Sequence, residues 1–304
     1  MSKKKRTTPQ PTFSSKKKST FKEVWFIVVI VLIALVLLLY PAVSTQWNNY
    51  RQHQVADAYS HDVGKLGNEK SQEIVKKAQQ YNKRNAAGPI IDPWNSRVSK
   101  DNKIYQEYLQ ELNTLDAMTE VTIPSINVDL PVYHGTEDST LSKGLGHLFG
   151  TALPVGGKNT HAVITGHTGM PNATMFDNLT KVKEGDSIYL NTYGKKMKYE
   201  VYSTEVVLPE ETDSLWPKKD EDLITLITCT PYGVNSHRLL VHAHRVPMDN
   251  EDENNMSIHP FFMQWWMFAF ALLAFLSLEF LIIYIFKTHK RVSVWNKKID
   301  KINQ

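Results

Sequence analysis

Two long apolar runs lie near the two ends of the chain. Residues 24–43 contain no charged residue, and residues 261–286 contain one. About 20 apolar residues span a bilayer as a helix, so we expect a transmembrane helix over each of these ranges. Trp265 and Trp266 lie near the start of the second run, as is typical of an aromatic belt at a membrane surface.

Between these runs the pattern of polar and apolar positions changes twice. Residues 46–85 lack proline, and their only glycines, Gly64 and Gly67, predict a break between two helices. Residues 86–101 hold two prolines and predict an irregular loop, whereas residues 103–117 predict one more short helix.

From Thr119 onward the chain consists of short runs that alternate apolar and polar residues and are separated by turn residues. The expected strands are 120–123, 128–133, 161–166, 187–192, 196–207, 223–229 and 238–244. Many short strands without a long helix between them indicate a closed β-barrel or a β-sandwich.

The charge is distributed unevenly along the chain. Eight Lys/Arg lie in the first 23 residues and six in the last 18, which leaves 21 basic against 29 acidic residues in the middle. A nucleic-acid-binding protein usually carries its positive charge on the folded domain, so we expect no nucleic-acid partner. Basic residues beside both apolar runs predict two cytoplasmic termini and an extracellular domain between the spans.

The first apolar run has an alternative interpretation as a signal peptide that is removed after export. Ala42-Val43-Ser44 is a tolerable cleavage site, although the run is longer than a typical signal core. Both interpretations place the following domain outside the cell.

Cys229 is the only cysteine. A single thiol excludes an intramolecular disulfide and a multi-thiolate metal site. A lone cysteine can be a small buried apolar residue. Unpaired thiols in exported proteins usually have a function, however, and this favours a reactive Cys229.

Three residues at predicted strand ends could supply cysteine chemistry. Cys229 ends an apolar run and is followed by the turn Pro231-Tyr232-Gly233, and His167 ends another run between glycines. Histidine can protonate a leaving amine and later accept a proton. Arg238 follows Cys229 by nine residues, one hairpin connection, and a guanidinium there can hold an oxyanion.

Each of these residues could instead be structural, and the histidine pairs His242/His244 and His161/His167 invite a zinc interpretation. We expect no metal, because no third ligand is spaced to join these pairs. We expect no cofactor either.

The order of these motifs resembles that of a sortase. The chain reads Ile-Thr-Gly-His-Thr-Gly at 164–169, Leu-Ile-Thr-Cys-Thr-Pro-Tyr-Gly at 226–233 and His-Arg-Leu-Leu-Val at 237–241. Residues 130–135 and 146–157 are also similar to that family. The resemblance covers roughly residues 118–245.

Two further features are similar to the class C, pilus-assembly sortases. One is the second apolar run after the barrel, and the other is Asp92-Pro93-Trp94, which resembles the lid motif of that class. Alone, this tripeptide could be an ordinary turn. The sequence Thr168-Gly169-Met170 after His167 departs from many members, which leaves the fine substrate specificity open.

The resemblance implies a mainly β fold: a closed eight-stranded sortase-type barrel with N-terminal helices and a lid loop, flanked by two transmembrane helices. It also implies a cysteine transpeptidase with catalytic His167, Cys229 and Arg238 and with Asp92, Pro93 and Trp94 as the lid. Its partners would be pilin subunits that carry LPxTG-like sorting signals, an acceptor lysine of another pilin, and the lipid bilayer.

The expected domains follow from these assignments. They are a basic cytoplasmic tail (1–23), a transmembrane helix (24–43), N-terminal helices and lid (44–117), the catalytic barrel (118–247), a linker (248–260), a second transmembrane helix (261–286) and a second basic tail (287–304).

Rival functions use the same residues. A housekeeping-type sortase would anchor surface proteins to cell-wall peptide, and a cysteine hydrolase would pass the acyl group to water. A membrane-tethered scaffold would not need Cys229 at all.

Overall fold

The computed structural model describes residues 14–85, 102–256 and 263–302. The chain forms two compact units. One unit contains residues 1–43 and 263–304, and the other contains residues 44–262.

The first unit contains α6 (Trp265–Ile302) and the first part of α1 (Ser14–Leu66), the two helical segments that the apolar runs predict. Helix α1 begins inside the expected tail and continues through Pro41, and α6 begins four residues after the expected start at 261. Both are long and apolar enough to cross a membrane. A proline costs one helical hydrogen bond, which apolar helices tolerate. The expected span 24–43 and the first helix of residues 46–85 are therefore one helix.

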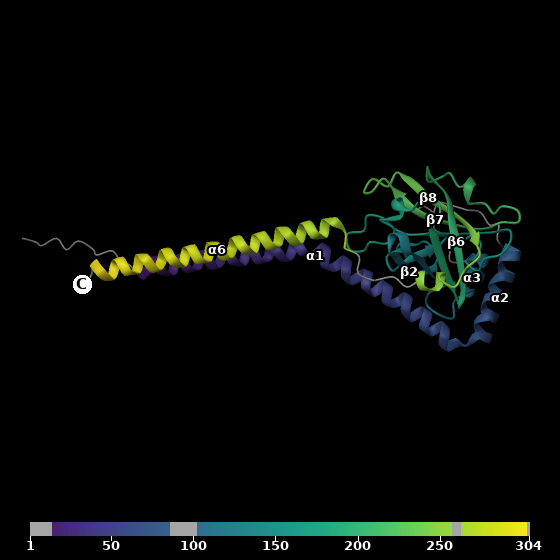
Figure 1. The fold of residues 1–304 in the computed structure, drawn as a ribbon, viewed down its shortest axis with the longest axis horizontal. Coiled ribbons are helices and arrows are strands. Elements are labelled where there is room, and N and C mark those ends of the chain that lie inside the picture. The colour runs from purple at the N-terminus through teal and green to yellow at the C-terminus, as the bar shows by residue number, and fades with distance from the viewer. Residues whose placement is uncertain (1–13, 86–101, 257–262, 303–304) are drawn as a thin grey trace, which may run out of the picture. The chain divides into compact units, whose positions relative to one another are not determined.

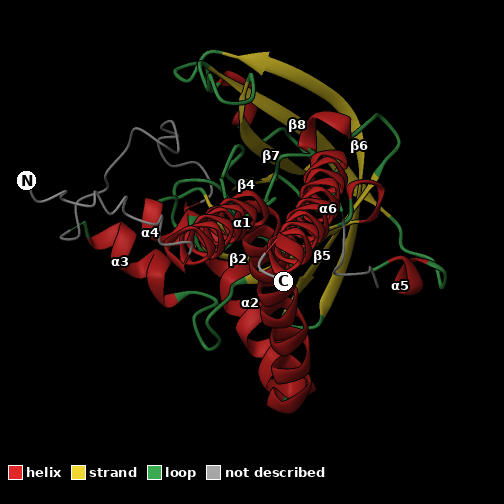
Figure 2. Ribbon diagram, turned by 90° about the vertical axis from the view of Figure 1, so that its left-hand side faces the viewer, coloured by secondary structure: helices red, strands yellow, loops and turns green. Residues whose placement is uncertain are grey.

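The second unit is built on a closed barrel whose strand order is β1-β2-β3-β4-β7-β8-β6-β5 (Figures 1 and 2). The strands are β1 (Thr119–Ile123), β2 (Val128–His134), β3 (Leu145–His147), β4 (Thr160–Thr165), β5 (Ser187–Thr192), β6 (Lys195–Val207), β7 (Asp222–Thr230) and β8 (His237–Val246). Seven of them match the predicted strands. The eighth, β3, is three residues long, too short to show an alternating pattern.

Two pairings in this barrel are parallel, β2 with β3 and β4 with β7, and the others are antiparallel. The barrel interior is apolar. Alternate residues of the strands fill it, among them Ile164 on β4, Leu226 on β7 and Val241 on β8. The residues between them point to the outer face, and on β7 these are Thr225, Ile227 and Cys229.

A second apolar cluster lies outside the barrel. Tyr81 of α2 (Asn68–Asn85) and Tyr108 of α3 (Lys103–Gln110) pack there with Tyr59 and Tyr193. Gly67, with φ of +81°, separates α1 from α2 in the conformation that glycine adopts without strain. The shorter elements are α4 (Asp138–Leu141), α5 (Asp252–Asn255) and the 3₁₀ turns η1 (Pro124–Ile126), η2 (Leu179–Lys181) and η3 (Asp213–Leu215).

The third helix is shorter than the expected range of 103–117. It ends at Gln110, because Glu111 has extended backbone angles and Leu112 has φ of +52°. The Leu112 side chain is buried in the second cluster, and the Leu112 carbonyl accepts a hydrogen bond from the Tyr193 hydroxyl. Tertiary contacts therefore end this helix against the local preference.

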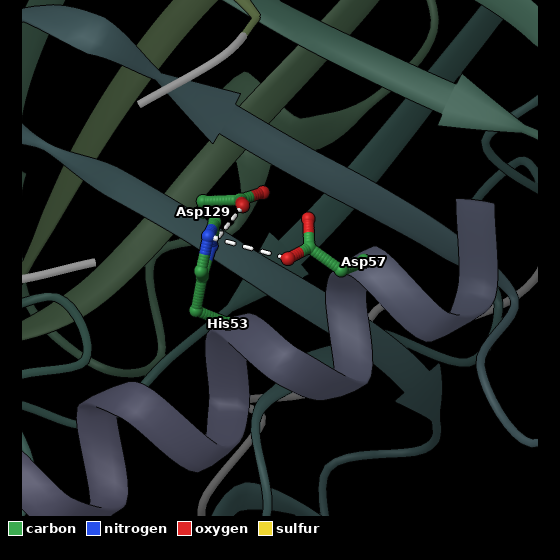
Figure 3. A group of neighbouring side chains, drawn as sticks. All are labelled: His53, Asp57 and Asp129. Carbon is green, nitrogen blue, oxygen red and sulfur yellow. Dashed lines mark hydrogen bonds and ion pairs between the residues drawn. The ribbon is translucent and has the colours of Figure 1, made fainter. Parts of the chain in front are cut away.

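Residues 44–66 of α1 are attached to the barrel by polar contacts. His53 Nδ1 lies 2.6 Å from Asp129 on β2, and its Nε2 lies 3.5 Å from Asp57 one helical turn away (Figure 3). The hydrogen bond to Asp129 raises the pKa of His53, and burial offsets part of this rise. This ion pair is therefore strongest below the ordinary imidazole pKa and is lost as the pH rises through the raised one.

Glu120 of β1 lies under the same helix. Its Oε2 accepts a hydrogen bond of 2.5 Å from Ser60 of α1 and one of 3.2 Å from Asn191 of β5. Burial, with the nearby charge of Asp129, raises the pKa of Glu120 from 4.5 to about 8. The neutral carboxyl is thus the form that the folded protein prefers.

We expect Glu120→Gln to flatten the pH dependence of stability. The raised pKa stabilises the wild-type fold fully below pH 4.5, and this contribution is lost as the pH rises toward about 8, with a slope of up to about 1.4 kcal/mol per pH unit. The measurement is the urea midpoint of the full chain in detergent at pH 5 and pH 8.5. Glu200→Gln, at an exposed carboxylate of β6, is the control. If the urea midpoint changes between pH 5 and pH 8.5 by the same amount in Glu120→Gln and in wild type, the Glu120 carboxyl is not buried in its neutral form.

Candidate active site

The end of β7 carries Cys229. This strand is buried along most of its length, and it stops at the turn that contains Pro231 and Gly233. The N–H groups of Val234 and Asn235 both donate to the Pro231 carbonyl, at 3.0 and 2.9 Å, and close the turn. A rigid strand followed by a tight turn fixes the thiol in position.

Arg238 lies directly opposite Cys229 in the antiparallel pair of β7 and β8. Directly opposed residues point to the same side of a sheet, so both side chains lie on the outer face of the barrel. Cys229 is 9% exposed and Arg238 is 7% exposed. Arg238 Nη1 donates to the carbonyls of Asn235 and His237 at 3.1 and 3.2 Å, which holds the guanidinium against the β7–β8 connection.

His167 reaches the same region from β4. The parallel register pairs Thr165 with Ile227, and the Gly166 N–H continues it by donating to the Ile227 carbonyl at 3.0 Å. Two residues further along each strand are His167 and Cys229. The end of β4, two residues before His167, therefore lies beside the part of β7 that leads to Cys229, and Arg238 is opposite Cys229 on β8.

Gly166 is required for this approach. A Cβ atom at this position would lie 2.6 Å from Leu145 and 2.7 Å from Phe176, closer than real contacts allow. The Gly166 carbonyl accepts a bond of 2.7 Å from the Thr228 hydroxyl, and the His167 carbonyl accepts one of 3.0 Å from the Phe176 N–H. The backbone on both sides of the histidine is therefore fixed.

Burial lowers the pKa of His167, and the charge of Asp138 offsets part of this effect. A histidine with a lowered pKa is neutral at pH 7 and can accept a proton.

Asp177 is a site residue that the sequence did not reveal. Its Oδ1 accepts hydrogen bonds from the Thr168 hydroxyl at 3.1 Å and from the Gly169 N–H at 2.7 Å. It thereby holds the loop that follows His167. Burial raises the pKa of Asp177. Asp177 is ten residues after His167 in a loop. Because a loop has no periodic pattern, nothing in the sequence indicated that the two residues lie near each other.

The structure thus places Cys229 opposite Arg238, with the end of β4 that precedes His167 on the neighbouring strand. The expected lid residues Asp92, Pro93 and Trp94 lie outside the described residues.

In the described parts of the chain, one group of His and Asp side chains has atoms close enough to hold a metal ion: His53, Asp57 and Asp129, all within 4.8 Å. The two carboxylates face opposite nitrogens of the His53 ring (Figure 3). One ion binds only one nitrogen of a ring, so the ion pairs described above account for this group.

Comparison with known proteins agrees with this site. The family described as "Sortase domain" matches residues 121–246. A curated relative, sortase D of Bacillus subtilis (strain 168), is 28% identical over 127 residues, which are 41% of this chain and 61% of that protein. The chain spans about half to three fifths of the curated relatives that it matches.

Solved structures match over more of their length. Sortase C-1 from Actinomyces oris is 53% identical with a TM-score of 0.56, over 59% of this chain and 99% of that one. The sortase C of Streptococcus pneumoniae is 37% identical with a TM-score of 0.59, over 64% of this chain and 97% of that one.

A closed eight-stranded barrel with a cysteine, a histidine and an arginine at adjacent strand ends defines a sortase-type fold. The chain belongs to the sortase family of cysteine transpeptidases, and its solved relatives place it with class C.

Proposed function

We propose that this protein is a pilin-joining transpeptidase. It cleaves an LPxTG-like sorting signal of one pilin subunit after the threonine and transfers the acyl group to a lysine of another. The observation that carries the proposal is the pairing of Cys229 with Arg238 across β7 and β8, with His167 two residues after the end of the neighbouring strand β4. The S. pneumoniae relative is described with a pilin substrate specificity, and this supports the choice of substrate.

In the first half of the reaction, the Cys229 thiolate attacks the carbonyl of the Thr–Gly bond. Arg238 is placed opposite the sulfur, where its N–H groups can stabilise the oxyanion. The neutral His167 takes the proton of the Cys229 thiol as the sulfur attacks, and it donates this proton to the departing glycine amine as the C–N bond breaks. A thioester between Cys229 and the threonine remains.

In the second half, the lysine amine of the next pilin attacks the thioester. His167, neutral after its donation, accepts the proton that the amine loses. An isopeptide bond forms, and the Cys229 thiolate is released. A thioester suits this exchange because it reacts readily with amines.

The membrane arrangement belongs to the same proposal. The two apolar helices α1 and α6 anchor the protein, and the basic residues at both ends lie in the cytoplasm. The barrel then faces the outside, where sorting signals of exported pilins are present.

Product analysis tests this function. We expect the full chain in detergent, given an LPxTG peptide, to form an amide with an added lysine-bearing pilin fragment, detected by mass spectrometry. Free peptide acid as the sole product in the presence of amine would identify a cysteine hydrolase instead. Transfer to a cell-wall peptide amine but not to the pilin lysine would support the housekeeping-type sortase.

A further inference from the structure

The outer face that carries Cys229 and Arg238 also carries a buried polar chain. Thr225 lies four residues before Cys229 on β7, and it is directly opposite His242 of β8. His161 lies on the adjacent strand β4. These three side chains are 0%, 4% and 2% exposed, in that order, and they are not among the catalytic residues.

Four hydrogen bonds join this chain. The Trp216 carbonyl lies 3.2 Å from His161 Nδ1, and His161 Nε2 lies 2.6 Å from the Thr225 hydroxyl. The same hydroxyl lies 2.7 Å from His242 Nδ1, and His242 Nε2 lies 3.0 Å from Glu205 of β6. The chain therefore crosses β4, β7 and β8 and ends on β6.

The chain holds one part of the β6–β7 connection, residues 208–221. Three consecutive residues of that segment are fixed there. The Ser214 side chain bonds Glu205, the Leu215 side chain packs with Ile227 and Leu240, and the Trp216 carbonyl faces His161. Ile227 and Leu240 are each two residues from the catalytic pair. A movement of Leu215 therefore changes the packing of Ile227 and Leu240, next to Cys229 and Arg238.

The four hydrogen bonds that join Trp216, His161, Thr225, His242 and Glu205 need more donor hydrogens than the neutral side chains supply. Both ends, the Trp216 carbonyl and the Glu205 carboxylate, accept only. Four bonds need four hydrogens, but two neutral histidines and the Thr225 hydroxyl supply three. The chain is complete only when it binds one extra proton.

The bond lost without that proton is the one to Trp216. The bond from His242 to a carboxylate is charge-assisted and is the stronger of the two ends. The bond from His161 to the Trp216 carbonyl is the longest of the four. When both histidines are neutral, a lone pair of His161 Nδ1 faces a lone pair of the Trp216 carbonyl oxygen. These repel each other, and the carbonyl is released.

The charged and titratable groups around these hydrogen bonds lie on the same strands and on the 208–221 segment. Lys218, in the 208–221 segment, lowers the pKa of both histidines, and it lies 5.6 Å from the centroid of the Tyr202 ring of β6. That ring stacks on His242 and contacts His244. Burial is the larger effect: it lowers the pKa of His161 to about 4 and also lowers that of His242, and Glu205 offsets part of the second shift.

We propose that His161, Thr225, His242 and Glu205 form a proton-dependent latch, which fixes residues 208–221 on the face that carries Cys229 and so positions the substrate. The latch closes in acid and opens as the pH rises toward neutral. The four residues are positioning residues, and their effect on substrate rests on the proposed transpeptidase function.

Two substitutions keep the latch closed by different routes. Glu205→Gln supplies the missing hydrogen, because an amide can donate to His242 Nε2 where a carboxylate cannot. We expect it to keep the latch closed at all pH values. Thr225→Val removes the shared hydroxyl, so the single hydrogen of neutral His161 is available for the Trp216 carbonyl and this variant also keeps the latch closed. Thr225→Ser retains the hydroxyl and behaves as wild type. Glu200→Gln, an exposed carboxylate on the same strand as Glu205, is the matched control.

Hydrogen exchange of the full chain in detergent tests the latch without any substrate. After correction for intrinsic rates, we expect residues 208–221 of wild type to be better protected at pH 4 than at pH 7.5, since burial lowers the pKa of His161 to about 4 and also lowers that of His242. In Glu205→Gln and in Thr225→Val these residues will be protected at both pH values. Wild-type pH dependence in Glu205→Gln, or loss of it in Thr225→Ser, would overturn the proposal. Because Glu205 is 41% exposed, its substitution tests the latch even where Thr225→Val does not fold.

Turnover of a sorting-signal peptide gives the second measurement. We expect KM at pH 7.5 to fall roughly fivefold in Glu205→Gln, the equivalent of one net hydrogen bond, with kcat unchanged. An equal change of KM in Glu200→Gln would overturn the positioning role. If the peptide is not turned over at all, the proposed function fails, while the exchange experiment still decides on the latch.

Discussion

Replacement of Cys229 with alanine will abolish the covalent adduct between the protein and a sorting-signal peptide. Cys229 is the only cysteine, so a thioester adduct on this protein can form only at Cys229. Transfer to an amine will fall at least ~10³-fold, because removal of a nucleophile leaves only binding and oxyanion contacts. Intact-protein mass spectrometry of the full chain in detergent measures both the adduct and the product.

The control for this experiment is Cys229→Ser, which keeps the size of the side chain and a weaker nucleophile. Cys229 is buried beside Arg238, so the melting temperature of each variant must be compared with that of wild type. A folded Cys229→Ala protein that still forms the adduct would end the assignment of the nucleophile. Unchanged transfer in this variant would favour a scaffold or another catalytic residue.

Arg238→Lys will lower the rate of thioester formation by about 10²-fold or more, which is the usual cost of removing an oxyanion donor. Lysine keeps the charge but replaces a planar fork by a single ammonium. Nη1 of Arg238 donates to two carbonyls, those of Asn235 and His237. An ammonium cannot keep these contacts and also present a donor in a fixed direction opposite Cys229.

The rate is measured as the appearance of the acyl-enzyme in a single turnover. His237→Gln, at the neighbouring position of β8, is the matched control and should retain wild-type rates, since His237 pairs with Thr230 and not with Cys229. Near-normal acylation by a folded Arg238→Lys protein would assign Arg238 a structural role. A slow rate in both variants would indicate that the hairpin, and not the guanidinium, was disturbed.

The strands of the barrel were predictable because their apolar positions alternate. β5 (Ser187–Thr192) agrees at both ends with its expected range, and β7 differs by one residue at each end. The short strand β3 gave no periodic signal, and it is recognised by its pairing with β2 and β4. The continuity of α1 through Pro41 was also not predictable, because proline in a soluble helix usually marks an end.

The positions of His167, Cys229 and Arg238 at or next to strand ends were predictable from the ends of three apolar runs. Their contacts were less so. Asp177 fixes the loop after His167 through a carboxylate eight or nine residues away. The latch joins residues that are 17, 37, 55 and 64 positions apart. The register of the barrel strands decides which of these distant residues become neighbours, and a local sequence pattern does not predict that register.

The strand order of the barrel predicts that the hairpin of Cys229 and Arg238 forms earlier in folding than the pairing that brings in His167. Cys229 and Arg238 belong to one antiparallel hairpin, and nine residues separate them. His167 reaches them only through the parallel pairing of β4 with β7, across about 60 residues of intervening chain. Local hairpins close early, and long parallel connections close late, because their loop entropy must be overcome first. If the proposed function is correct, a newly made chain carries a thiol without His167 beside it until the barrel is complete, and Cys229 becomes reactive only when β4 has paired with β7.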